Sequence, residues 1–411
     1  MPVANKLVSR KRYLDALTPF KGNGNAKVIT GIRRCGKSSL LSTFIDTIPK
    51  NNNVIEINME FSENDELKNW KKLLEYVGSE LDEKKENTLI VNEVQDITQW
   101  ELAIRDLIAK ELCDIYLTGS NSNLLSSEYS TYLGGRYNAV HMLPLSFQEC
   151  AEFNKRYNGG TDPDGLLERF IRVGGFPIVW RYGQDENSSI KTVRTIVDSS
   201  INNDITKRYN VRNADLLTMI LKTVASTVGS YVSAINIYNT LVSGGMPVSK
   251  ETVYEYLGYL EAANLIIKAE TIDIRGRAIL KSSYKYYLTD LAIKHALIGY
   301  RPNDISGHIE NIIFTELLGR GYDVHVGRSD EKEVDIVAER GDERIYVQAC
   351  TMFGSDDTMR RELGSLESIK DSYPKFIVLK DPGVFRGTTS KGIVICGLRE
   401  FLEMESYRLS Q

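Results

Sequence analysis

The sequence Lys-Val-Ile-Thr-Gly-Ile-Arg-Arg-Cys-Gly-Lys-Ser, at residues 27–38, decides the fold of this chain. Gly31, Gly36, Lys37 and Ser38 fit the pattern G-x-x-x-x-G-K-[ST], which forms a phosphate-binding loop when it lies between a strand and a helix. The two glycines allow the backbone to turn so that successive N–H groups point at phosphate oxygens. The pattern therefore predicts a nucleotide-binding loop.

The residues on either side of the loop fit this prediction. Residues 28–30 are a short apolar run typical of a buried strand, and residues 39–45 have the composition of a helix, whose positive N-terminal end would face the phosphates. Lys37 would contact the β- and γ-phosphates and the Ser38 hydroxyl would ligate Mg²⁺, so the expected cofactors are ATP and Mg²⁺. A glycine-rich turn without a ligand is the alternative. The predicted nucleotide-binding residues are Gly31, Ile32, Arg33, Arg34, Cys35, Gly36, Lys37, Ser38 and Ser39.

The length and composition indicate a soluble protein of several domains. At 411 residues, two or three domains are expected. The hydrophobic and charged fractions, 42% and 26%, are those of a globular protein, and no run approaches the roughly 18–20 apolar residues of a membrane span. The chain starts without the apolar segment of a secretory signal, and its five cysteines lack C-x-x-C spacing, so a cytoplasmic location with reduced thiols and no membrane partner is expected. Because the net charge is −4, contact with nucleic acid would require a local basic patch.

Strands alternate with helices over the first third of the chain, which predicts an α/β fold with a parallel, doubly wound sheet. Beyond Pro144 the pattern changes to helices, and residues 212–290 then show three helices followed by a β-hairpin, the order of a winged helix. A third α/β unit follows. The predicted domains are a P-loop ATPase core at 1–145, a helical lid at 146–211, a winged helix at 212–300 and a C-terminal domain at 301–411.

Asn92 and Glu93 end the third predicted strand of the core. In P-loop ATPases with an added strand, an Asp-Glu pair stands here; the Asp holds the water shell of Mg²⁺ and the Glu polarises the attacking water. Glu93 is therefore the candidate catalytic base. Ser38 and Asn92 are the predicted metal-binding residues. Asn92 can accept a hydrogen bond from a water on the metal, but it lacks the charge that attracts Mg²⁺. We expect weaker Mg²⁺ binding and slow hydrolysis, with nucleotide binding retained.

Further polar residues lie where a nucleotide would need them. Ser120 and Asn121 follow the next strand and would sense the γ-phosphate or its water, and Arg136 would act as an arginine finger in trans or form a surface salt bridge. The turn Gly-Gly-Phe-Pro at 174–177 would place Pro177 against the adenine, or would only interrupt a helix. These four residues complete the predicted nucleotide site.

Several motifs in order along the chain resemble those of bacterial and archaeal AAA-type ATPases that carry a C-terminal DUF4143 domain. The resemblance implies an ATPase core of the ASCE/AAA type, a winged helix and a C-terminal domain like the PD-(D/E)xK nucleases. The family pattern has Asp where this chain has Asn92, which bears on hydrolysis rather than on binding. The motifs are Gly31-Ile-Arg-Arg-Cys-Gly-Lys-Ser-Ser-Leu, Asn92-Glu-Val-Gln, Thr118-Gly-Ser, Pro144-Leu-Ser-Phe-Gln-Glu, Gly174-Gly-Phe-Pro, Lys285-Tyr-Tyr-Leu-Thr-Asp-Leu-Ala, Glu310-Asn and Glu333-Val-Asp.

The C-terminal domain departs from an active nuclease at one step. Glu310 or Glu316 on a helix and Asp335 on a strand could hold Mg²⁺, as such nucleases require. The final E-x-K is replaced by Gln348 and Cys350, and a cysteine cannot supply the cation at neutral pH. We expect a fold kept for binding or assembly, with nuclease activity as the lesser alternative.

The winged helix would contact DNA through its hairpin rather than its third helix, because that helix carries Glu251, Glu255 and Glu261 against Lys250. A protein-interaction role carries equal weight. The first hypothesis is thus an ATP-driven conformational switch with an unidentified protein partner; a DNA-associated protein tuned by ATP is the second. Whether the chain forms a homo-oligomer is left open. The basic hairpin spans 275–285 and includes Arg275, Arg277, Lys281 and Lys285.

Overall fold

The computed structural model describes residues 7–125, 133–160, 162–183, 185–276, 278–329, 332–353 and 356–408, without the side chains of residues 123, 125, 281–283 and 356–358. The chain divides into two compact units. Unit 1 comprises residues 1–143 with 262–264, and unit 2 comprises 144–261 with 265–411. Within the described residues, no helix combines the length and apolar character needed to cross a membrane.

Unit 1 is built on a five-stranded sheet in the order β2-β3-β4-β1-β5, and every pair of neighbouring strands is parallel. Strand β4 lies between the P-loop strand β1 and β3. It is the added strand that the sequence predicts. This order brings the carboxyl ends of β1, β3 and β4 to one edge of the sheet. The strands are β1 (Ala26–Thr30), β2 (Asn53–Asn58), β3 (Asn87–Asn92), β4 (Asp114–Gly119) and β5 (Tyr137–His141).

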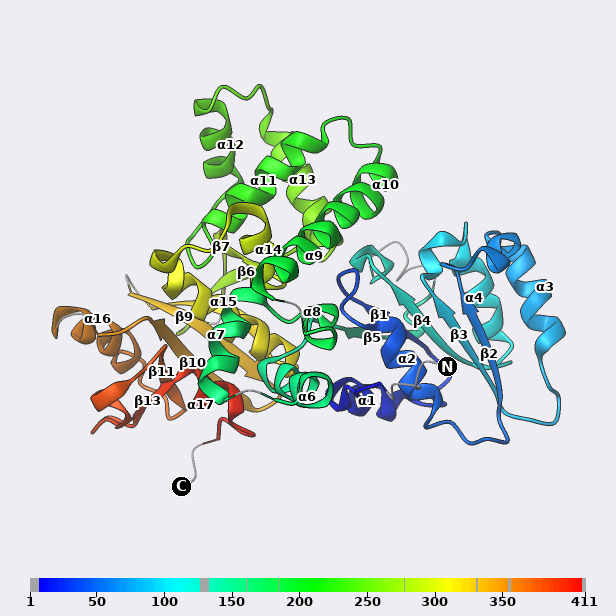
Figure 1. The fold of residues 1–411 in the computed structure, drawn as a ribbon, viewed down its shortest axis with the longest axis horizontal. Coiled ribbons are helices and arrows are strands. Elements are labelled where there is room, and N and C mark those ends of the chain that lie inside the picture. The colour runs from blue at the N-terminus through cyan, green and yellow to red at the C-terminus, as the bar shows by residue number, and fades with distance from the viewer. Residues whose placement is uncertain are drawn as a thin grey trace. The chain divides into compact units, whose positions relative to one another are not determined.

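Helices cover both faces of this sheet (Figure 1). One face packs against α3 and α4, whose apolar side chains, such as Val77 and Ile104, join those of β1 to β4 in a single core. On the other face Phe44 of α2 lies against Tyr116 of β4, with 4.5 Å between ring centroids. Burial on both faces explains why the central strands β1, β3 and β4 are mostly apolar and buried along their length, whereas the edge strand β2 alternates. The helices of unit 1 are α1 (Lys11–Leu17), α2 (Lys37–Ile45), α3 (Trp70–Glu80) and α4 (Trp100–Ala109).

Unit 2 begins with a run of helices and continues into a mixed eight-stranded sheet in the order β12-β13-β11-β10-β9-β8-β6-β7. The hairpin β6–β7 belongs to this sheet, because β6 pairs in parallel with β8. Helix α15 (Ile305–Gly319) packs against β8, β9 and β10 (Figure 1). The strands are β6 (Ile266–Asp273), β7 (Ile279–Leu288), β8 (Asp323–Ser329), β9 (Lys332–Arg340), β10 (Glu343–Cys350), β11 (Lys375–Leu379), β12 (Gly387–Thr388) and β13 (Ile393–Gly397).

Three helices, α11, α12 and α13, precede the hairpin β6–β7, as the sequence pattern predicted. The third α/β unit that the sequence predicts contains the strands β8 to β11. The helices of unit 2 are α6 (Phe147–Asn158), α7 (Pro163–Val173), α8 (Pro177–Arg181), α9 (Glu186–Ser199), α10 (Lys207–Tyr209), α11 (Ala214–Ser226), α12 (Ala234–Ser243), α13 (Lys250–Ala262), α14 (Leu291–Ile298), α15 (Ile305–Gly319), α16 (Asp356–Glu367) and α17 (Leu398–Glu403).

Some predictions of local structure were wrong or incomplete. The charged composition of residues 64–86, with apolar residues at roughly helical spacing, predicts one helix, but Ser62–Leu67 forms a 3-10 turn and α3 spans only Trp70–Glu80. Asn69 separates the two, and its side chain caps α3 by accepting a hydrogen bond from the Lys71 N–H. Helices α14 and α17 and strand β13 were not predicted, since short buried elements give a weak periodic signal.

The Gly-Gly-Phe-Pro turn has a packing role inside unit 2. Gly174 has φ +67°, and a Cβ there would lie 1.8 Å from a carboxylate oxygen of Asp290. Asp290 accepts hydrogen bonds from the N–H groups of Gly175 and Ala292, so one buried carboxylate holds the turn and caps α14. Burial raises the pKa of Asp290 to about 7. Two of the motifs named above thus form one structural joint.

Candidate functional site

The glycine loop leaves β1 at Gly31 and enters α2 at Gly36. Gly31 passes so close to β5 that a Cβ would lie 2.1 Å from the carbonyl oxygen of Met142. Gly36 is the N-cap of α2 with φ +108°, a backbone conformation that side chains rarely allow. Both glycines of the motif are therefore required by the backbone itself.

Lys37 is buried, and its ammonium lies inside the loop, 2.9 Å from the carbonyl oxygen of Gly31 and 3.2 Å from that of Ile32. Helix α2 has no side-chain cap, so its first N–H groups are left for another acceptor. Ser38 is partly exposed beside them. An uncapped helix N-terminus, a central ammonium and an adjacent hydroxyl fit the phosphates of a nucleotide and its Mg²⁺.

The two polar residues at the end of β3 are joined to β4 by Thr118. The Thr118 hydroxyl donates to Asn92 Oδ1 and accepts from the Glu93 N–H, each at 3.2 Å. Glu93 follows the strand in a left-handed conformation, with φ +55°. Its Oε2 accepts a hydrogen bond from the Gln95 amide at 2.5 Å. The candidate base is thus buried and held by two neighbouring polar residues.

The other predicted residues are placed less uniformly. Ser120 and Asn121 follow β4 and are buried, and the Ser120 carbonyl accepts a hydrogen bond from the Asn264 side chain within unit 1. Arg136 is exposed in the turn before β5, which agrees with either of its proposed roles. Pro177 begins α8 in unit 2, and its contact with adenine stays a prediction.

Sequence reasoning missed three residues that support the loop, its strands or the candidate base. Arg10 is buried and donates to the carbonyl oxygens of Cys35, at 3.1 Å, and Leu143, at 2.8 Å. His141, at the end of β5, lies 3.3 Å from the Thr30 hydroxyl, and burial together with the Lys37 charge lowers its pKa to about 4. Gln95 is the third. Only Gln95 could have been found from the sequence, because it ends the motif Asn92-Glu-Val-Gln.

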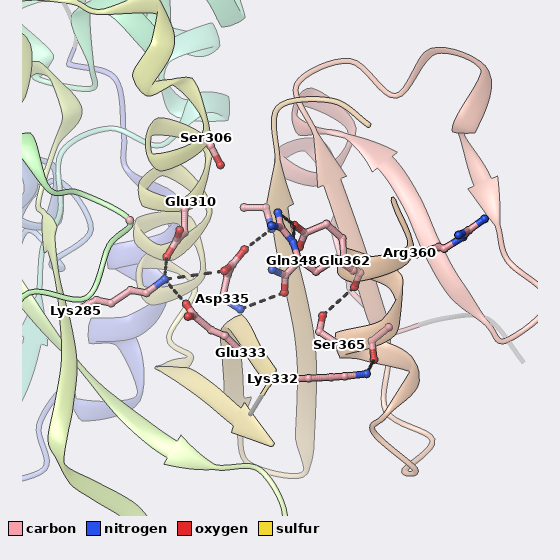
Figure 2. A pocket seen from close by; sticks show the side chains of 14 residues that line it. Lys285, Ser306, Glu310, Lys332, Glu333, Asp335, Gln348, Arg360, Glu362 and Ser365 are labelled. Atoms are coloured by element: carbon pink, nitrogen blue, oxygen red, sulfur yellow. Dashed lines mark hydrogen bonds and ion pairs between the residues drawn. The ribbon is translucent and has the colours of Figure 1, made fainter. Parts of the chain in front are cut away.

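A second polar cluster lies in unit 2, in a cleft of about 480 Å³ between α15, the strands β7, β9 and β10, and α16. Figure 2 shows the Lys285 side chain directed at Glu310, Glu333 and Asp335. Its Nζ lies 2.8 Å from a Glu310 oxygen, 2.6 Å from a Glu333 oxygen and 4.0 Å from an Asp335 oxygen. Gln348 faces the same cleft from β10. We call these five residues the Lys285 cluster.

The cluster decides three open points. Glu310, not Glu316, faces the cleft, since Glu316 pairs with Arg320 at 2.6 Å. Cys350 is buried, and burial raises the pKa of its thiol, so it carries no charge. The prediction that Lys285 belongs to an exposed basic hairpin was wrong, because only 2% of its side chain is exposed.

The remaining basic residues of the hairpin give little support to a DNA contact. Arg275 is exposed in the turn between β6 and β7. Arg277 and the side chain of Lys281 lie outside what the structure describes. The local basic patch therefore rests on Arg275 among the described side chains.

Two family models match parts of this chain. The family model of an AAA domain (AAA_14) matches residues 23–151, and that of a domain of unknown function, DUF8612, matches residues 164–304. Among solved structures, a crystal structure of Cdc6p from Pyrobaculum aerophilum is similar with a TM-score of 0.33 and 12% identity, covering 76% of this chain and 97% of that one.

Two relatives match nearly the whole chain. An uncharacterized protein of Methanocaldococcus jannaschii, MJ1544, is 29% identical over 84% of this chain and 79% of its own length. An uncharacterized protein of Haemophilus influenzae is 34% identical over 92% of this chain and 94% of its own length. The chain belongs to the same family as this Haemophilus influenzae protein, with a P-loop AAA domain at residues 23–151 followed by a DUF8612 domain.

Proposed function

We propose that this protein is an ATP-driven conformational switch with slow hydrolysis. ATP with Mg²⁺ binds at Gly31–Ser38, and its presence changes the state of the residues at the carboxyl edge of the unit 1 sheet. The observation that carries the proposal is the position of the Lys37 ammonium, buried inside a glycine loop at the N-terminus of an uncapped helix. This arrangement gathers positive charge where phosphates would lie.

Slow hydrolysis follows from the residue pair at the end of β3. Glu93 holds a carboxylate where a base is needed, whereas the Asn92 amide is neutral and already accepts a hydrogen bond from Thr118. A bound Mg²⁺ supplies charge neutralisation for the phosphates, and a neutral ligand at Asn92 attracts the ion less than a carboxylate would. ATP binding is therefore retained while its hydrolysis is slow.

The route from nucleotide to the rest of the chain would run through Asn264. This residue is buried in a left-handed turn, with φ +57°, after α13 and before β6. Its amide donates at 3.1 Å to the carbonyl of Ser120, one of the two predicted sensor residues. A shift of the Ser120 backbone on nucleotide binding would therefore be transmitted through this hydrogen bond to the segment that connects α13 and β6.

The test measures ATP binding beside ATP turnover for the natural chain, Lys37→Ala and Asn92→Asp. We expect the natural chain to bind ATP with little turnover, Lys37→Ala to lose binding, and Asn92→Asp to raise turnover about tenfold or more because a carboxylate strengthens the metal site. Brisk turnover by the natural chain would refute slow hydrolysis. ATP affinity unchanged in Lys37→Ala would refute the site.

Several finer assignments belong to the same proposal. The helices α11 to α13 with the hairpin β6–β7 act as a winged helix that contacts a protein partner, and the chain is a member of the DUF4143-type ATPases in the cytoplasm. Arg136 acts in trans if the chain assembles into an oligomer. Association with DNA through residues 275–285 has less support, because Lys285 is buried among carboxylates. A salt-sensitive DNA affinity that Arg275→Ala lowers would favour it.

A further inference from the structure

The Lys285 cluster has the carboxylates of a metal site but already contains a cation. Its members come from β7, α15, β9 and β10, so the fold, and not one sequence motif, brings them together (Figure 2). The Lys285 ammonium is the charged group common to Glu310, Glu333 and Asp335. Burial by itself would lower the pKa of Lys285, but the three carboxylates outweigh it and raise the pKa above its usual range. The lysine is therefore charged.

Several of the oxygens that a metal ion would need are engaged by protein donors. Glu310 Oε1 accepts from Lys285 and, at 2.7 Å, from the hydroxyl of Tyr287. Asp335 Oδ2 accepts from the Ala349 N–H at 2.8 Å, and Gln348 Oε1 accepts from the Asp335 N–H at 3.3 Å. Among the described residues, no group of three or more His, Cys, Asp or Glu side chains is arranged to hold a metal ion.

The other cationic side chains of the cleft are directed at groups other than the carboxylates of the Lys285 cluster. Lys332 donates to the Gly364 carbonyl at 3.0 Å, Arg361 pairs with Glu362 at 2.7 Å, and Arg360 points away from the carboxylates in Figure 2. A divalent ion placed among the carboxylates would have to displace the Lys285 ammonium or share their charge with it. The donor set does not fit a divalent metal.

We propose that Lys285 is the resident cation of this cleft: its ammonium occupies the place of a divalent metal and makes unit 2 a metal-independent binding or assembly domain. The carboxylates serve to hold this lysine between the hairpin and the C-terminal strands. Removing the ammonium leaves Glu310, Glu333 and Asp335 facing one another without a counter-charge, which is the condition under which a carboxylate cluster takes up a divalent ion.

The test is Mn²⁺ binding by electron paramagnetic resonance, on nucleotide-free protein that carries Ser38→Ala to remove the P-loop contribution. In this background we expect that any residual Mn²⁺ binding is unchanged by Asp335→Asn, so none of it is at the Lys285 cluster. Adding Lys285→Ala should create one Mn²⁺ site, about tenfold tighter or more than any binding before it, and Asp335→Asn should abolish this new site. Bound Mn²⁺ in the Lys285-containing protein that disappears with Asp335→Asn would overturn the proposal.

A second measurement keeps the test decisive if Lys285→Ala does not fold. Thermal unfolding of the Lys285-containing protein is then followed with excess chelator and with Mn²⁺, again without nucleotide. An unchanged melting temperature supports the resident cation, because a ligand of the folded state would raise it. A rise on adding Mn²⁺ that Asp335→Asn removes would overturn the proposal.

Discussion

Replacing Lys285 by methionine should destabilise the protein in a way that depends on pH. Methionine keeps the length and apolar stem of the lysine side chain, so the change removes mainly the ammonium. Glu310 and Asp335 are both buried, and Lys285 is the cation that both contact. Removing one partner from a buried ion pair costs about 3–5 kcal/mol, because the other charge is left without compensation.

The pH dependence follows from the pKa values of the stranded carboxylates. Burial raises the pKa of Glu310 and raises that of Asp335 well above its usual value; Lys285 opposes both shifts. Without the lysine, both pKa values rise further. The folded state then binds more protons than the unfolded state above about pH 4, so the free energy of unfolding falls as pH rises. Each pKa unit of upward shift that titrates between pH 5 and pH 8 lowers the free energy of unfolding of the variant by about 1.4 kcal/mol over that range.

The assay is urea denaturation of the natural chain and Lys285→Met at pH 5 and pH 8, monitored by circular dichroism in chelator. We expect a deficit of about 3–5 kcal/mol in the free energy of unfolding at pH 8 that becomes smaller at pH 5. The matched control is Lys285→Met with Glu310→Gln, which removes one stranded charge and should recover part of the loss. A deficit that is equal at both pH values, or one below about 1 kcal/mol at pH 8, would refute the reasoning.

Three further predictions concern the rest of the molecule. Gln95→Leu should lower ATP turnover about tenfold without changing ATP affinity, because the amide positions the Glu93 carboxylate, and an equal loss of affinity in a binding assay would contradict this role. Arg10→Met should lower the free energy of unfolding by about 2–4 kcal/mol and weaken ATP binding, because two buried carbonyls, including that of Cys35, lose a charged donor; urea denaturation with unchanged stability would count against it. His308 is buried with neither ring nitrogen hydrogen-bonded, and burial with the nearby Lys294 charge lowers its pKa to about 3, so stability should fall as pH drops below about 6.5; His308→Phe should reduce that loss by about 2 kcal/mol at pH 5, and parallel pH profiles would disprove it.

Much of unit 1 could be predicted because its signals are local. The glycine loop, the apolar strands and the polar residues after each strand are read from short stretches, and parallel pairing then forces Gly31, Glu93 and Ser120 to one edge of the sheet. The positions of Arg10 and His141 could not be predicted in this way. Arg10 lies 25 and 133 positions from its two partners, and no periodic pattern spans such distances.

The sequence by itself determined that this chain carries a P-loop motif, a candidate base at Glu93 and a neutral residue at Asn92, because each depends on residue type at a fixed spacing. Only the tertiary structure decided the fate of Lys285. In the sequence it belongs to a basic hairpin. In the fold the hairpin β6–β7 joins the sheet through the pairing of β6 with β8, and Lys285 of β7 lies against the carboxylates of α15 and β9. The physical reason is that charge pairing depends on distance in space, and burial makes an unpaired ammonium far too costly to leave alone.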